Sequence, residues 1–141
     1  MPSYLLDTNI FVHAIRNSTL WQTKIVPLHD PLNTIPACVY SVVTEGELRS
    51  LVHQLGWGAA KHTQLQSLLA QIRRLDISTT AILQDYATID SHCRTSGFTL
   101  SKNDLWIAAT ASALGLTLLT TDKDFDPLDG VFLNRIWIDP T

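Results

Sequence analysis

Short apolar runs alternate with segments of helical periodicity along this chain, and the alternation limits its fold more than any other feature. The apolar runs have the length of strands and cover residues 3–6, 35–40, 75–77, 116–120 and 135–138. Between them, apolar residues recur at helical spacing over 10–17, 41–55, 59–73, 79–94 and 101–114. Strands separated by helices are joined by right-handed crossovers, so the sequence predicts an α/β fold with a parallel sheet covered on both faces.

The size and composition are those of one domain, which we expect to cover residues 1–141. A hydrophobic content of 45% suffices for a substantial core, and a net charge of −3 argues against both disorder and a strongly basic surface. An acid at position 7 leaves no room for a signal peptide, and no apolar run approaches the ~20 residues of a membrane span. Cys38 and Cys93 lie far apart, as expected for reduced thiols in a cytoplasmic protein.

Acidic residues recur where this topology would bring them together. They are Asp7 after the first apolar run, Glu45 and Glu47 in the second helical segment, Asp104 at the start of the last one, and Asp122 and Asp124 after the fourth apolar run. In open α/β sheets, ligands gather at the carboxyl ends of the strands. Clustered carboxylates repel one another unless a cation lies between them. The pattern therefore predicts a divalent-metal site and the hydrolysis of a phosphodiester.

Structural roles compete for two of these acids. Asp7 can cap the helix that follows it, as can Asn9, which could equally bind a ligand. Asp104 stands three residues after Ser101, the spacing of a capping box, yet it shares a helix face with small and apolar residues such as Ile107. Both interpretations stay open for each acid.

Periodicity also leaves open which glutamate faces the site. At 100° per residue, Glu45 and Glu47 each lie roughly 75 to 85° from the centre of the apolar row, on opposite flanks. In the last acidic stretch, Asp122 is closer to the strand end, whereas Asp124 is either a second ligand or a turn residue. The hydroxyl of Thr121 is placed to position a water.

Taken together, the four acidic motifs resemble those of the PIN domain, and in particular the VapC toxins of bacterial toxin–antitoxin pairs. They are Leu-Leu-Asp-Thr-Asn, Ser-Val-Val-Thr-Glu-Gly-Glu-Leu, Asn-Asp-Leu-Trp-Ile-Ala-Ala-Thr-Ala and Leu-Leu-Thr-Thr-Asp-Lys-Asp-Phe, in family order across nearly the whole chain. The resemblance implies a PIN-like three-layer sandwich, with a five-stranded, mainly parallel sheet flanked by helices. It also implies endoribonuclease activity that depends on Mg²⁺ or Mn²⁺.

The same resemblance implies roles for individual residues. The acidic quartet is then Asp7, Glu47, Asp104 and Asp122, with Glu47 preferred over Glu45 because it completes a Thr-x-x-Glu-Leu pattern. We expect Asp7, Asp104 and Asp122 to bind metal and Glu47 to bind metal or orient the attacking water. Asn9, Thr121 and Asp124 match supporting positions. Expected partners are an RNA substrate such as a tRNA or rRNA, a VapB-like antitoxin and a second copy of the chain.

Two other functions are weighed against the nuclease. A catalytically inactive PIN-fold module for RNA or protein would not need an intact quartet. A phosphoacceptor receiver domain would need adjacent acids after its first strand, where Asp7 stands alone. The tryptophans Trp57, Trp106 and Trp137 are expected in the core or at an interface rather than as base-stacking platforms.

Overall fold

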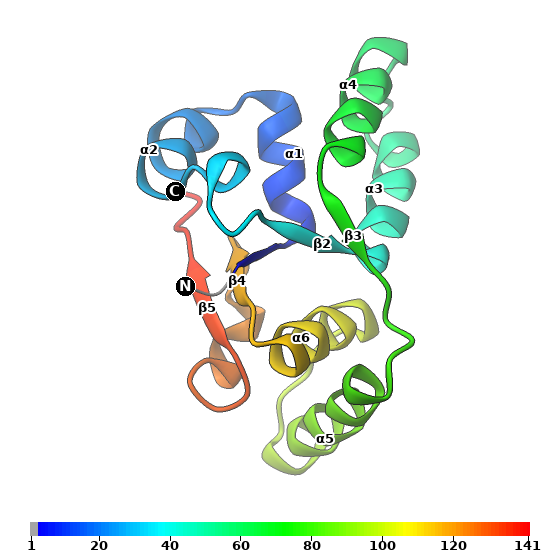
Figure 1. The fold of residues 1–141 in the computed structure, drawn as a ribbon, viewed down its shortest axis with the longest axis vertical. Coiled ribbons are helices and arrows are strands. Elements are labelled where there is room, and N and C mark those ends of the chain that lie inside the picture. Colours follow the sequence, from blue (N-terminus) through cyan, green and yellow to red (C-terminus); the bar gives the residue numbers. More distant parts are fainter. Residues whose placement is uncertain (1–2) are drawn as a thin grey trace.

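The computed structural model of the chain describes residues 3–141, so residues 1–2 of the predicted domain lie outside the described residues. Five parallel strands form one sheet in the order β3-β2-β1-β4-β5 (Figure 1). The strands are β1 (Tyr4–Leu6), β2 (Val39–Ser41), β3 (Arg73–Leu75), β4 (Thr117–Thr120) and β5 (Asn134–Trp137). The predicted α/β fold with a five-stranded parallel sheet is confirmed.

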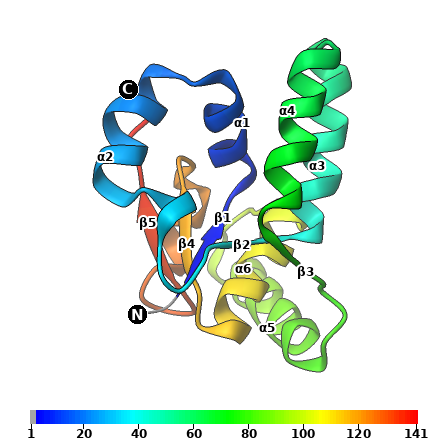
Figure 2. The same cartoon turned by 45° about the horizontal axis from the view of Figure 1, so that its top comes forward.

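Helices cover both faces of this sheet (Figure 1). They are α1 (Thr8–Arg16), the π-helix η1 (Trp21–Ile25), α2 (Val26–His29), the 3-10 helix η2 (Pro31–Asn33), α3 (Val42–Gln54), α4 (Ala59–Ala70), α5 (Thr80–Ser96), α6 (Lys102–Leu114) and the 3-10 helix η3 (Lys123–Leu128). Figure 2 shows α3 beside α4 and α5 beside α6 at different ends of the molecule. Between residues 3 and 141, every helix is too short or too polar to cross a bilayer.

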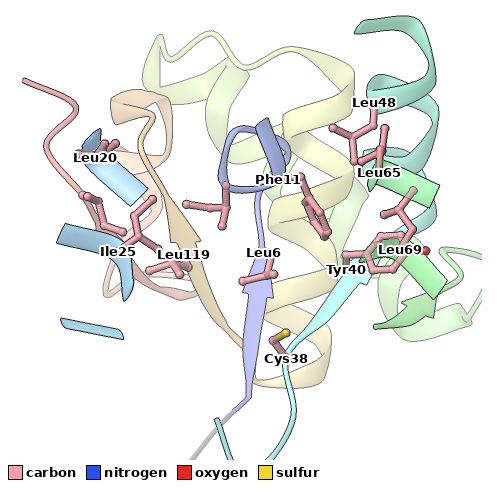
Figure 3. Close-up of a cluster of buried hydrophobic side chains, with 12 residues drawn as sticks. Leu6, Phe11, Leu20, Ile25, Cys38, Tyr40, Leu48, Leu65, Leu69 and Leu119 are labelled. Atoms are coloured by element: carbon pink, nitrogen blue, oxygen red, sulfur yellow. The ribbon is translucent and has the colours of Figure 1, made fainter. Parts of the chain in front are cut away.

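The two cores follow from the alternation of side chains along the central strands. Leu6 and Leu119 point to one face, where they pack with α1, η1, α3 and α4 (Figure 3). Leu5 and Leu118 point to the other face, where α5, α6 and η3 cover them. All four leucines are buried. Because both faces of β1 and β4 are covered, consecutive residues of these strands are apolar.

Three predicted elements had wrong boundaries. The second strand was expected over 35–40, but β2 begins at Val39 and the Ile35 side chain is 95% exposed. The helix expected over 59–73 ends at Ala70, and Arg73–Leu75 forms the third strand in place of 75–77. Apolar pattern misses β3 because it lies at the edge of the sheet, where exposed charged residues such as Arg73 and Arg74 are tolerated.

The starts of α3, α5 and α6 were predicted to within one residue, because capping residues act locally. Ser41, Thr79 and Ser101 each accept a backbone N–H at the start of α3, α5 and α6. Gly97 and Gly115 end α5 and α6 with positive φ angles of 79° and 63°. These helix starts fix how the side chains of α3 and α6 are directed toward the sheet.

Candidate active site

A cleft of about 760 Å³ opens at the carboxyl ends of β1 and β4. The strand ends contribute Asp7 and Asp122, α3 contributes Glu47, and α6 contributes Asp104. Asn9 also lines the cleft, whereas Thr121 and Asp124 are not among its lining residues. Because β1 and β4 are neighbours, their C-terminal acids meet at one edge of the sheet.

Asp7 is held on both oxygens and is only 4% exposed. Its Oδ1 accepts the Thr8 backbone N–H at 2.8 Å, which makes it the N-cap of α1, and its Oδ2 accepts the Thr120 hydroxyl at 2.7 Å. Burial raises the pKa of Asp7 to about 6, with smaller contributions from the charges of Glu47 and Asp122. Capping and lining the cleft are therefore not alternatives, because one side chain does both.

Asp104 likewise combines the two roles. Its backbone N–H donates to Ser101 Oγ at 3.1 Å, as the capping spacing predicted, while its carboxyl group lines the cleft. Burial and, after it, the nearby charges of Asp7 and Asp122 raise the pKa of Asp104 to about 7. The cleft thus disfavours the charged form of Asp104.

Asp104, Asp122 and Asp124 each bring one carboxylate oxygen within 4.8 Å of the others. Asp122 caps η3, since its Oδ1 accepts the Asp124 N–H at 2.9 Å. Burial and the neighbouring Asp122 raise the pKa of Asp124. Asp124 therefore lies at the outer edge of the acidic group, close enough to share a cation with Asp104 and Asp122.

The two glutamates of α3 occupy different environments. Glu47 faces the cleft, and its Oε1 accepts the Thr8 hydroxyl at 2.7 Å. Glu45 pairs with Arg49 Nε and with an Arg74 terminal nitrogen, each at 3.0 Å. Burial acts to raise the pKa of Glu45, but the hydrogen bonds and charges of both arginines outweigh it, so the pKa is lowered. The choice that periodicity left open is thus Glu47 for the cleft.

Two threonines that the sequence did not single out hold the acids in place. Thr120 Oγ1 donates to Asp7 Oδ2 and accepts the Asp122 N–H at 2.9 Å, so one hydroxyl ties the two strand ends together. Thr8 holds Glu47 and lies 3.2 Å from the Thr44 hydroxyl. The sequence feature that could have pointed to Thr120 is its position at the end of an apolar strand, two residues before Asp122. Thr121 was predicted instead, and its backbone carbonyl accepts the indole N–H of Trp137.

The oxygens gathered in the cleft suit a hard divalent cation such as Mg²⁺ or Mn²⁺. Among the cleft-lining side chains of residues 3–141 there is no lysine or arginine to offset the acids. The pKa values of Asp7 and Asp104 are raised first by burial and then by the charges of neighbouring acids. A bound cation would supply the missing positive charge, so the residues present fit such an ion.

Known proteins are similar to this chain in sequence. The PIN domain family matches residues 4–131. Ribonuclease VapC5 of Mycobacterium tuberculosis is 33% identical over 132 residues, covering 89% of this chain and 87% of that protein. Ribonuclease VapC4 of the same organism is 37% identical over 93 residues, covering 64% of this chain and 71% of VapC4.

A solved structure extends the likeness to three dimensions. The crystal structure of VapBC-5 from Mycobacterium tuberculosis, a member of the VapBC family of toxin–antitoxin systems, superposes with a TM-score of 0.71 at 27% identity. The alignment covers 98% of this chain and all of that one. The family match over residues 4–131 and the similarity to VapC5 show that the chain belongs to the PIN-domain family and, within it, to the VapC proteins.

Proposed function

We propose that this protein is an endoribonuclease that depends on Mg²⁺ or Mn²⁺ and acts as the toxin of a toxin–antitoxin pair. The observation that carries the proposal is the gathering of Asp7, Glu47, Asp104 and Asp122 in one cleft without a lysine or arginine among the described lining residues. The names of the relatives support it, because VapC4 and VapC5 are both called ribonucleases.

We assign Asp7, Asp104 and Asp122 to metal binding, directly or through water, with Asp124 as a further oxygen donor. A bound divalent cation would offset charge on the phosphate and lower the pKa of an attacking water. Thr120 fixes the relative positions of Asp7 and Asp122, and each Asp7 oxygen keeps a second lone pair beside the hydrogen bond it accepts. Glu47, fixed by Thr8, is placed to accept a proton or hydrogen bond from that water.

RNA cleavage in the presence and absence of metal tests the activity. The purified chain, free of any partner, should cleave structured RNA with Mg²⁺ or Mn²⁺ and stop with EDTA. An Asp122→Asn variant purified in parallel controls for contaminating nucleases. Undiminished cleavage in EDTA would rule out the mechanism, whereas RNA binding without cleavage under all metal conditions would favour a catalytically inactive PIN-fold module.

The proposal includes a VapB-like antitoxin as partner. Support comes from the VapBC assignment of the structural relative and from apolar side chains exposed near the first helices, Leu28 at 71% and Leu32 at 41%. An arginine of the partner would complement the uncompensated carboxylates of the cleft. Expression of the chain alone should slow bacterial growth, and co-expression of the antitoxin should restore it. Harmless expression of the folded chain would contradict the toxin role but not the nuclease.

The remaining parts of the proposal are the extent of the domain, the assembly and the target. We take residues 1–141 as one PIN domain, supported by a sheet that runs from Tyr4 to Trp137. We further propose a homodimer that acts in the cytoplasm on a tRNA or rRNA. Light scattering of the purified chain tests the dimer, and sequencing of RNA ends after induced expression tests the target.

A further inference from the structure

Apolar side chains line the cleft beside the acids. They include Val43 in the first turn of α3, Ile77 after β3 and Trp106 on α6. Each of these three side chains is partly exposed, and the three come from separate elements. A phosphate group gains nothing from apolar side chains, whereas a flat, uncharged ring does.

Trp106 is held in place by an aromatic partner. Its indole stacks on the Tyr86 ring of α5, with 3.9 Å between ring centroids and 25° between planes. Tyr86 is not among the cleft-lining residues, so it lies behind Trp106 and leaves the remaining indole surface to the cleft. A ring that is already fixed loses little conformational entropy when a ligand stacks on it. The Tyr86–Trp106 pair is therefore prepared for stacking.

The charge of the cleft also calls for an uncharged contact. Its described lining residues include several carboxylates and no lysine or arginine, so protein cations inside the cleft cannot anchor the RNA backbone. Stacking of a base on an aromatic side chain is worth about 1–3 kcal/mol and does not depend on charge. Asp104 and Trp106 both line the cleft from α6, so a base held by Trp106 would lie in the same cleft as the acidic group.

We propose that Trp106, supported by Tyr86 in a cleft that Val43 and Ile77 also line, is the binding platform for a nucleobase next to the cleaved phosphodiester. This inference rests on the proposed ribonuclease function and sharpens its substrate class. A base can stack on Trp106 only when it is free of its own helix, so the substrate is an unpaired nucleotide in a loop, bulge or single strand. The sequence pattern predicts a core or interface position for Trp106, and in the structure it is partly exposed, stacks on Tyr86 and lines the cleft.

Binding of a short labelled oligoribonucleotide tests the platform without relying on cleavage. The measurement uses Glu47→Gln protein with Mg²⁺, because this variant keeps the three proposed metal ligands. Trp106→Leu should weaken binding roughly 5- to 150-fold, the range expected for loss of one stacked base, and Trp106→Phe should keep most of the affinity. Trp57→Leu is the matched control, because Trp57 is also partly buried but lines a separate, smaller cavity. Thermal unfolding of each variant checks that it is folded.

An abasic strand separates stacking from a structural role. The Trp106→Leu penalty should disappear when the nucleotide at the cleavage position lacks its base, since no stacking is then left to lose. An equal penalty on both strands, or no penalty on either, would overturn the platform while leaving the nuclease intact if the parent cleaves RNA. A parent that binds through Trp106 yet never cleaves would support the platform and contradict the nuclease. A parent that binds no RNA would overturn both.

Discussion

The two flanks of helix α3 treat their carboxylates in opposite ways. On one flank, Glu45 is paired with Arg49 and Arg74 and has a lowered pKa. On the other flank, Glu47 enters a cleft where Asp7 and Asp104 have raised pKa values and where hydroxyl and backbone N–H groups, rather than cations, donate hydrogen bonds to the acids. Arginines pair with Glu45, which connects α3 to the edge strand β3, whereas no lysine or arginine of residues 3–141 lines the cleft where the acids meet. The unpaired carboxylate Glu47 is therefore a better guide to function than the paired carboxylate Glu45.

The largest expected effect is on RNA cleavage. Loss of a residue that only supports a site residue typically lowers activity roughly 10- to 100-fold. Glu47→Gln should lower kcat by more than this, because it removes the proposed acceptor of the proton or hydrogen bond of the attacking water. Glu45→Gln should leave most of the cleavage and cost only about 0.2–1 kcal/mol of stability for its exposed ion pairs. Single-turnover cleavage assays measure the first effect and urea unfolding the second. Equal loss of cleavage in both variants would break the distinction between the two flanks.

The next effect is on stability in the presence of metal. Mg²⁺ at 100 times its dissociation constant should stabilise the parent by about 2.7 kcal/mol, because only the folded cleft binds it. Asp104→Asn should lose most of this response, and Glu45→Gln should keep it. Without metal, Asp104→Asn should be as stable as the parent or more stable, because one repelling charge is gone. Thermal unfolding with EDTA and with Mg²⁺ measures both terms, and an equal Mg²⁺ response in all three proteins would exclude Asp104 as a ligand.

A smaller effect is expected from Thr120, which acts through the acids it holds. Thr120→Val keeps the shape of the side chain but leaves Asp7 and the Asp122 N–H without their shared hydroxyl. We expect about 10- to 100-fold lower cleavage and a loss of about 1–3 kcal/mol in stability. Thr110→Val is the control, because the buried Thr110 hydroxyl bonds only a carbonyl within α6. Similar activity in the two variants would contradict a positioning role for Thr120.

The smallest expected effect is a pH dependence that should appear only without metal. Asp7 and Asp104 have pKa values of about 6 and about 7 in the folded chain, so the folded state holds more protons than the unfolded state between about pH 4 and pH 7. Their contribution to stability is therefore present at about pH 4 and lost as the pH rises to about 7. Glu45, whose pKa is lowered, acts in the opposite direction, because its contribution is lost as the pH falls.

Urea unfolding of the parent and of Asp104→Asn across this range, in EDTA, measures the difference. The parent should lose stability relative to the variant as the pH rises, and a constant difference between the two proteins would show that Asp104 is not a repelled carboxyl group.

Much of the fold could be predicted from the sequence because the relevant forces are local or periodic. The strand that ends at Leu6, the cap at Ser101 and the stop at Gly115 each depend on a few neighbouring residues. Hydrophobicity predicted the edge strand at 75–77 rather than at Arg73–Leu75, because Arg73 and Arg74 are exposed and only Leu75 is partly covered. The segment Trp21–Asn33, which forms η1, α2 and η2, was not among the predicted helices.

The cleft shows the same limit at the level of single side chains. The acids of the quartet were chosen from motifs, and the structure places all of them at one cleft. The role of Thr120 depends on β1 and β4 being neighbours in register, with Leu6 opposite Leu119, which no local pattern reports. The separation of Glu45 from Glu47 likewise depends on Arg74, which is far away in the chain.

Asp7 caps α1 and Asp122 caps η3 with the same carboxyl groups that line the cleft, and this shared use shapes how the sequence can evolve. A lineage released from selection for cleavage would still be under selection for folding. Asn and Ser preserve most of a cap, whereas Ala does not. Inactive descendants should therefore carry Asn or Ser at positions 7 and 122 far more often than Ala. Such neutral, cap-preserving residues would be the trace that a lost catalytic centre leaves in the genes of its descendants.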